Sequence, residues 1–228
     1  MNPAETNVAN GAADNVADAR GSAPARIRRL LKPAGSEVGR SFAALAENLG
    51  ALGRPARSVV VTGPERGVGR TTVCLGLGAA LAVAGKKVAV VDCNLDRPYL
   101  HGCFGRSNFT GLTSALEGGR DLEGYGFEVA PNLRIIPTGP VLSGSKALAK
   151  SPRLVEAVQA LRGKRDVVLL DAPVAREVLA APSLWGSFDG VLLVVHASRT
   201  PKGVARGFID DLLDAQINLL GVVLNGHV

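Results

Sequence analysis

The chain has 228 residues, enough for one α/β domain and a tail. Hydrophobic residues make up 46% of it and aromatic residues 4%, so the core must be built mainly from valine, leucine and alanine, as in a parallel sheet covered by helices. The net charge of +6 is dispersed, with no basic run interleaved with aromatic residues, which speaks against nucleic-acid binding. No apolar run reaches the ~18 residues that span a bilayer, so no transmembrane segment is expected.

The first 35 residues are expected to form a disordered tail, because they are rich in Ala, Asn, Gly and Pro and show no apolar period. They lack the charged and apolar regions of a secretory signal. Near the end of this tail, Arg26 to Lys32 form a short basic amphipathic piece. It either contacts anionic lipid or an acidic partner, or serves as a solvated linker. Apolar residues at helical spacing then predict a helix over 41–52.

A glycine-rich stretch joins a predicted strand to a predicted helix. Val59 to Val61 read as a buried parallel strand, and a helix is expected over residues 71–81. Strand, glycine loop and helix in this order are the context of a phosphate-binding loop, because backbone N–H groups converge there on an anion. The Thr71 hydroxyl is placed to ligate magnesium. The residues predicted to bind the nucleotide in this stretch are Gly67, Val68, Gly69, Arg70, Thr71 and Thr72.

One position of this loop departs from the usual pattern. The residue after the last glycine is normally lysine and here is Arg70, and Pro64 stands where the first glycine is usual. Arginine keeps the charge but is a longer planar fork, which crowds the β/γ-phosphate site or reaches it at another angle. The stretch therefore indicates a phosphate-binding-loop fold more strongly than it indicates catalysis on a phosphate. The alternative interpretation is a plain glycine turn after a strand.

Two aspartates follow predicted buried strands. Asp92 comes after Val88 to Val91, and Asp171 comes after Val167 to Leu170. The carboxyl ends of parallel strands lie at the edge where such sheets bind ligands. Asp92 is therefore expected to hold a magnesium-bound water or to accept a proton from a nucleophile, and Asp171 to be a second carboxylate at the magnesium ion. Helix capping or simple surface exposure is the alternative for both.

The remaining pattern alternates helices and strands. Helices are predicted over residues 111–116, 152–161 and 203–213, and strands over residues 133–136, 191–195 and 219–224. Strands that alternate with helices imply a parallel sheet with right-handed crossovers.

Taken in order, several motifs resemble those of the bacterial tyrosine kinases of capsule and exopolysaccharide assembly. These belong to the deviant P-loop ATPases, which include the Min and Par positioning proteins. The resemblance covers about residues 36 to 225. It rests on Val88 to Asp92, Arg97-Pro98-Tyr99-Leu100-His101, Gly111-Leu112-Thr113, Asn132 to Gly139, Asp171-Ala172-Pro173 and Gly221 to Asn225. The second and fourth of these motifs favour the polysaccharide kinases over the positioning ATPases.

The resemblance implies an α/β fold of the P-loop NTPase type over residues 36–228, with a mostly parallel sheet and helices on both faces. It implies a site for ATP or ADP with Mg²⁺, in which Asn225 faces the base. The metal positions would be Thr71, Asp92 and Asp171, and the catalytic positions Asp92, Asp171 and Asn94. It also implies a cytoplasmic protein held at the inner face of the membrane by a membrane-spanning chain-length or co-polymerase partner, and it leaves a homo-oligomer open.

The departures from this family point away from an active kinase. Arg70 replaces the loop lysine, and Glu65 stands where the Min and Par group has its signature lysine. Asn94 replaces the second aspartate of its motif, and Asp96 replaces an arginine. The helix before the first strand lacks the family's Glu-x-x-Arg-x-x-Arg pattern. With only two tyrosines, the chain also lacks the C-terminal tyrosine cluster that family members phosphorylate.

Three hypotheses follow. The first is a degenerate kinase-like regulator of polysaccharide polymerisation or export, with nucleotide and Mg²⁺ binding weak or lost. The second is an active ATP-dependent autokinase or ATPase of the same pathway, since both strand-end aspartates and the loop threonine are present. The third is a positioning ATPase of the Min and Par type.

Overall fold

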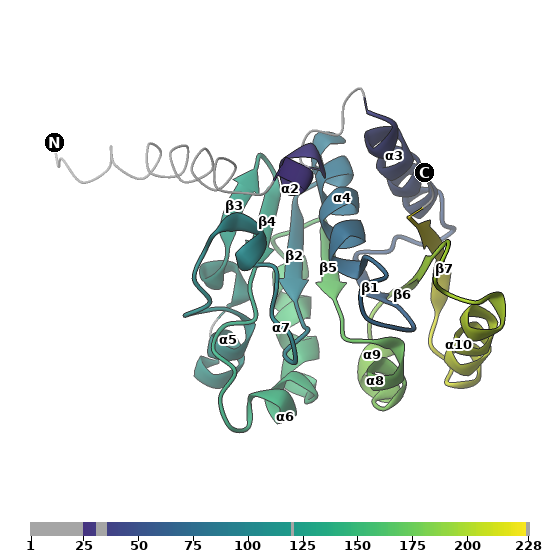
Figure 1. Cartoon of the computed structure of the whole chain (residues 1–228). Coiled ribbons are helices and arrows are strands. Elements are labelled where there is room, and N and C mark those ends of the chain that lie inside the picture. Colours follow the sequence, from purple (N-terminus) through teal and green to yellow (C-terminus); the bar gives the residue numbers. More distant parts are fainter. Residues whose placement is uncertain (1–24, 31–35, 120, 227–228) are drawn as a thin grey trace, which may run out of the picture.

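The computed structural model describes residues 25–30, 36–119 and 121–226, and these form an α/β fold around one seven-stranded sheet (Figure 1). The strand order is β3-β4-β2-β5-β1-β6-β7, and β3 alone runs antiparallel, against β4. The strands are β1 (Ser58–Thr62), β2 (Val88–Asp92), β3 (Phe127–Ala130), β4 (Leu133–Ile136), β5 (Val167–Asp171), β6 (Gly190–His196) and β7 (Leu219–Asn225).

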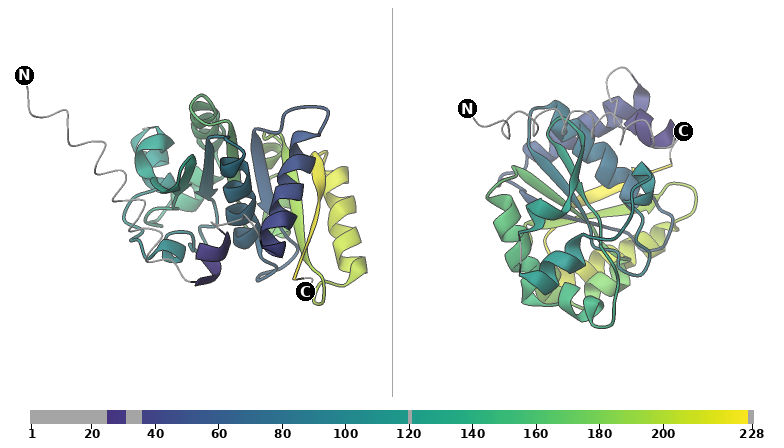
Figure 2. Two further views of the ribbon diagram at one scale, coloured as in Figure 1. Left: turned by 90° about the horizontal axis from the view of Figure 1, so that it is seen from above. Right: turned by 90° about the vertical axis from the view of Figure 1, so that its left-hand side faces the viewer.

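Helices cover both faces of this sheet (Figure 2). One apolar cluster packs α2, α3, α4 and η1 on one face, and a second packs α5, α7, α9 and α10 on the other. The helices are α2 (Ala25–Leu30), α3 (Glu37–Gly50), α4 (Arg70–Val83), η1 (Gly102–Phe104), α5 (Leu112–Gly118), η2 (Leu122–Tyr125), α6 (Ser145–Ala149), α7 (Pro152–Arg162), α8 (Ala175–Leu179), α9 (Pro182–Trp185) and α10 (Lys202–Asp214).

The three central strands explain the continuous apolar runs of the sequence. Every residue of β2, β5 and β1 is buried, because each strand has a neighbour on both sides and helices on both faces. The expected P-loop NTPase-like α/β fold, with a mostly parallel sheet and helices on both faces, is confirmed.

Helix α4 carries the glycine loop and is buried almost all round. Its outer side lies against α3, where Gly76 meets the ring of Phe42. A Cβ atom added at Gly76 would lie 2.3 Å from that ring, so only glycine allows this close helix–helix approach. This close packing positions the start of α4 relative to the sheet.

The structure differs from the sequence analysis at the end of the expected tail. Ile27 and Leu30 of α2 are buried in the apolar cluster that includes α4, so these two apolar side chains of the basic piece pack on the domain. This differs from both a solvated linker and a lipid contact through these side chains. Residues 1–24 lie outside the described residues, so a tail there and the boundary at residue 36 stay predictions. Among the helices that the structure describes, none is long and apolar enough to cross a bilayer.

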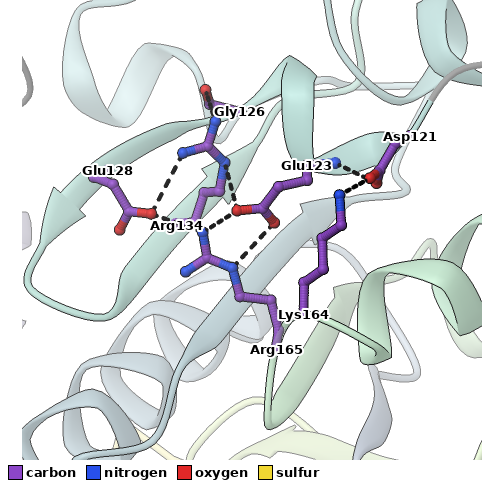
Figure 3. A network of polar contacts seen from close by, with 7 residues as sticks. All are labelled: Asp121, Glu123, Gly126, Glu128, Arg134, Lys164 and Arg165. Atoms are coloured by element: carbon purple, nitrogen blue, oxygen red, sulfur yellow. Dashed lines mark hydrogen bonds and ion pairs between the residues drawn. The ribbon is translucent and has the colours of Figure 1, made fainter. Parts of the chain in front are cut away.

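The edge strand β3 was not predicted, and a charged network holds it in place (Figure 3). The buried guanidinium of Arg165, just before β5, contacts Glu123 of η2 and Glu128 of β3. Arg134 of β4 pairs with Glu128 at 3.4 Å and donates to the carbonyl oxygen of Gly126 at 2.7 Å. The apolar pattern is weak here because these side chains contact one another rather than the core.

Candidate nucleotide site

The carboxyl ends of β1, β2 and β5 meet at one edge of the sheet, as predicted. Asp92 and Asp171 are direct partners in the β2–β5 register, and both are buried. The loop after β1 runs above them into α4. The topology therefore brings the glycine loop and the two strand-end aspartates to a single place.

Two glycines give the loop its shape. Gly67 and Gly69 have φ angles of 77° and 99°, which side-chain-bearing residues rarely adopt. Asn225 at the end of β7 donates from Nδ2 to the Val68 carbonyl oxygen at 2.8 Å, and a Cβ atom on Gly69 would lie 2.0 Å from that nitrogen. Glycine at position 69 thus permits Asn225 to hold the loop. Whether Asn225 also faces a nucleotide base stays a prediction.

The connection between β6 and α10 holds the same loop from another side. Arg199 donates from Nη2 to the Gly67 carbonyl oxygen at 2.6 Å. The Thr200 hydroxyl donates to a Glu65 carboxylate oxygen at 3.1 Å. Sequence reasoning did not identify these tethers, because the contacting residues are about 130 positions apart and Arg199 belongs to no motif.

Arg70 points toward the sheet edge and is 9% exposed. Its Nη1 atom donates to the carbonyl oxygen of Ala172, directly after β5, at 2.7 Å. Burial and Asp92 raise the pKa of the neighbouring Asp171, and the charge of Arg70 opposes this rise. To reach a phosphate instead, the guanidinium would have to break this buried charge-assisted hydrogen bond, which is worth about 1.5–3 kcal/mol.

Thr71 and Asp171 form the pair expected at a magnesium site. The Thr71 hydroxyl donates to Asp171 Oδ2 at 2.6 Å. Burial, together with the charge of Asp92, raises the pKa of Asp171 to about 7, against the opposing effects of Thr71 and Arg70. Two buried carboxylates that disfavour each other's ionisation are stabilised by a divalent cation, so these residues fit Mg²⁺. The described residues contain no cluster of three His, Cys, Asp or Glu side chains that could hold a metal alone.

Asp92 organises its own loop. Its two carboxylate oxygens accept hydrogen bonds from the backbone N–H groups of Asn94, Tyr99 and Leu100 at 2.9–3.1 Å. Burial raises the pKa of the Asp92 carboxyl, although these three donors favour its ionised form. The loop that carries Asn94 is therefore shaped by Asp92, and a direct role of Asp92 in catalysis or metal binding stays a prediction.

A cavity of about 230 Å³ opens beside the glycine loop. Four predicted site residues line it, namely Gly67, Arg70, Thr71 and Asn94, whereas Val68, Gly69, Thr72, Asp92, Asp171 and Asn225 do not. The other lining residues are Arg66, Arg97, Pro98, Tyr99, Val174 and Glu177. Three arginines and one glutamate are among the lining residues, so cationic side chains outnumber anionic ones there, as a polyphosphate site requires.

Asp96, which stands at the family's arginine position, lies beside this cavity. It forms an ion pair with Lys146 of α6, and this contact lowers the pKa of Asp96. Burial and the hydrogen bond with Asp96 raise the pKa of Glu177. Where the family resemblance implies an arginine, this chain therefore has an acidic pair, Asp96 and Glu177, beside the cavity.

Known protein families, related sequences and solved structures that are similar to this chain agree with this architecture. The family model described as cellulose biosynthesis protein BcsQ matches residues 56–201. EpsB of Ralstonia solanacearum is 36% identical over 168 residues, which are 73% of this chain but only 22% of that relative. The kinase domain of the Escherichia coli tyrosine kinase ETK has a TM-score of 0.78 and 25% identity, covering 88% of this chain and 79% of that one.

A more distant neighbour is the septum site-determining protein MinD of Pyrococcus horikoshii, solved with Mg-ADP. It has a TM-score of 0.60 and 28% identity, covering 74% of this chain and 69% of that one. The resemblance to the tyrosine kinases of capsule and exopolysaccharide assembly, and to the wider Min and Par group, is thereby confirmed. The chain belongs to the family described as cellulose biosynthesis protein BcsQ, and its relatives are the bacterial tyrosine kinases of this P-loop group.

Proposed function

We propose that this protein regulates the polymerisation or export of an exopolysaccharide as a kinase-like partner with impaired ATP chemistry. It acts at the inner face of the cell membrane by binding a membrane-spanning chain-length or co-polymerase protein. The family and its relatives support the pathway, and the state of the loop supports the impaired chemistry.

The position of Arg70 carries the proposal. The Arg70 guanidinium donates a hydrogen bond to the Ala172 carbonyl oxygen and interacts with the charge of Asp171. It therefore has less charge and fewer donors to offer a phosphate. Glu65 and Asp96 add negative charge where the family resemblance implies cations. Each change weakens the stabilisation of the charge that develops on a transferred phosphoryl group.

Residual nucleotide binding is consistent with the rest of the site. The N–H groups of the glycine loop and α4, together with Arg66 and Arg97, would hold the phosphates of ATP or ADP. Thr71 and Asp171 would hold Mg²⁺, which when bound neutralises phosphate charge. In this proposal the nucleotide stabilises the regulator and is turned over slowly or not at all.

Complementation of a deletion strain tests the proposal. Asp171→Asn removes the carboxylate at the magnesium site but keeps an oxygen that can accept from Thr71. If the protein acts through its partner, this variant restores polysaccharide output to the wild-type level, and a membrane-spanning protein co-purifies with both forms. A variant that is stably produced but behaves like the deletion would contradict the proposal.

The intact Thr71–Asp171 pair favours one other function, an active ATPase of the same pathway. ATP hydrolysis by the purified protein separates the two. A wild-type rate well above that of Asp171→Asn would support the active enzyme, whereas equal rates would remove it.

A further inference from the structure

The two edges of the sheet are protected differently. The edge strand β3 has four residues, carries Glu128 and has a register shift against β4. Short length, charge and irregularity are the features by which proteins prevent edge strands from pairing with other chains. The opposite edge strand, β7, has seven residues and contains neither a charged residue nor proline. In the part of the chain that the structure describes, no strand pairs with its outer side.

The backbone of β7 offers hydrogen-bonding groups along this outer side. Asn225 accepts from Ala197 N through its carbonyl oxygen, so its backbone groups point toward β6. Backbone groups alternate in direction along a strand, so those of Val222 and Leu224 point away from β6. The side chains of these two residues are 44% and 59% exposed. Among the described residues no strand pairs with these outward N–H and C=O groups, and an uncharged, apolar edge of this kind is a template for another strand.

Helix α10 packs on the face of the sheet beside β7. The order of its charged residues indicates which chain supplies the strand that pairs with β7. Lys202 and Arg206 lie in its first half, and Asp210, Asp211 and Asp214 in its second half. This order opposes the helix dipole, which favours anions at the N-terminus and cations at the C-terminus. Arg206 and Asp210 form an ion pair, yet their side chains are 77% and 54% exposed and remain accessible to a partner.

We propose that a second copy of this chain pairs with β7, edge to edge and antiparallel, about a twofold axis perpendicular to the sheet. This symmetry joins the two seven-stranded sheets into one and places both α10 helices on the same face, running in opposite directions. The basic first half of each α10 then lies beside the acidic second half of the other. The unfavourable charge order within one helix becomes complementary between two helices.

Sedimentation of the full chain over a range of concentrations, without nucleotide, tests this pairing. The wild type is expected to dimerise. Leu224→Lys places a like charge on each edge and is expected to weaken the dimer by about tenfold or more. Val222→Pro removes an outward N–H group while keeping the bonds to β6, and has the same expected effect. Leu142→Lys is the matched control, because Leu142 is 60% exposed on a loop far from β7 in the chain and should leave the dimer unchanged.

A charge exchange tests the role of α10 independently. Arg206→Glu alone is expected to weaken the dimer, and Arg206→Glu combined with Asp210→Arg to restore it, since opposite charges then meet again across the axis. Circular dichroism confirms that each variant is folded. A wild type that stays monomeric at all concentrations would overturn the proposal. So would a dimer that Leu224→Lys and Val222→Pro leave intact, or a double variant as weak as Arg206→Glu.

Discussion

At the residue scale, Asp171 shows how the site balances stability against ligand binding. Its pKa of about 7 in the folded chain lies above the ordinary value of an aspartate, so the folded state binds a proton more tightly than the unfolded state. Without a cation, its contribution is most favourable at low pH and is lost as the pH rises through about 7. The carboxylate is retained at a cost to the free protein, which is the pattern expected of a ligand-binding group.

We therefore predict that Asp171→Asn raises the free energy of unfolding of the nucleotide-free protein above pH 7 and changes it little near pH 4. Denaturant unfolding at both pH values measures the difference. The same change should abolish any stabilisation by Mg-ADP. A variant less stable than the wild type at high pH would show that Asp171 stabilises the free protein as a charged group.

Position 69 has two requirements that substitutions can separate. Its backbone is left-handed, and any Cβ atom there would contact Asn225. We predict that Gly69→Ala lowers stability by more than the 1–2 kcal/mol of a left-handed residue alone, because its Cβ atom also displaces Asn225. Gly85→Ala is the matched control, since Gly85 has a φ of 84° with no atom within 4 Å of the added Cβ. Equal losses of unfolding free energy in the two variants would mean that the Asn225 contact does not constrain the loop.

At the scale of elements, the charged network holds the helix η2 and the short edge strand β3 in place. Burial raises the pKa of Glu123, but the hydrogen bond and charge of Arg165 outweigh this and place it below its usual range. A carboxyl group with a lowered pKa stabilises the folded state above its unfolded pKa, and this contribution is lost as the pH falls through the folded pKa.

Arg165→Met should accordingly cost about 2–3 kcal/mol at neutral pH, between the values for exposed and buried ion pairs. The difference from wild type should shrink below about pH 4, as Glu123 becomes protonated. Lys164→Met, which removes an exposed pair with Asp121, provides the comparison and should cost less than about 1 kcal/mol. A loss for Arg165→Met that is independent of pH would show that packing, rather than charge, is what the side chain supplies.

The sequence predicted the central elements because their signals are local. Buried strands are continuous apolar runs, and Asp92 and Asp171 follow two of them directly. Arg70 could be identified as a departure, but its bond to Ala172 joins residues 102 positions apart. Arg199 contacts Gly67 across 132 positions, and Glu128 of β3 contacts Arg165 across 37 positions. No local pattern encodes either contact. The part of the site that could not be predicted is thus the part made by tertiary packing.

At the scale of the whole molecule, Asn225 connects the candidate nucleotide site to the edge strand β7. It is the last residue of β7 and holds the Val68 carbonyl oxygen of the glycine loop. The site lies where three separate segments meet, namely the glycine loop, the connection after β6 and the end of β7. In the proposed regulator, this arrangement would couple a nucleotide in the loop to the proposed pairing surface on β7 without phosphoryl transfer.

Calorimetric titration with Mg-ADP tests most directly whether Arg70 impairs the nucleotide site. We predict that Arg70→Lys binds about 10- to 100-fold more tightly than the wild type, because lysine offers a phosphate the charge that Arg70 commits to Ala172 and Asp171. Arg70→Met, which has no charge, should bind no more tightly than the wild type. Wild-type binding as tight as that of Arg70→Lys would contradict the account, since Arg70 would then serve the phosphates as well as the usual lysine.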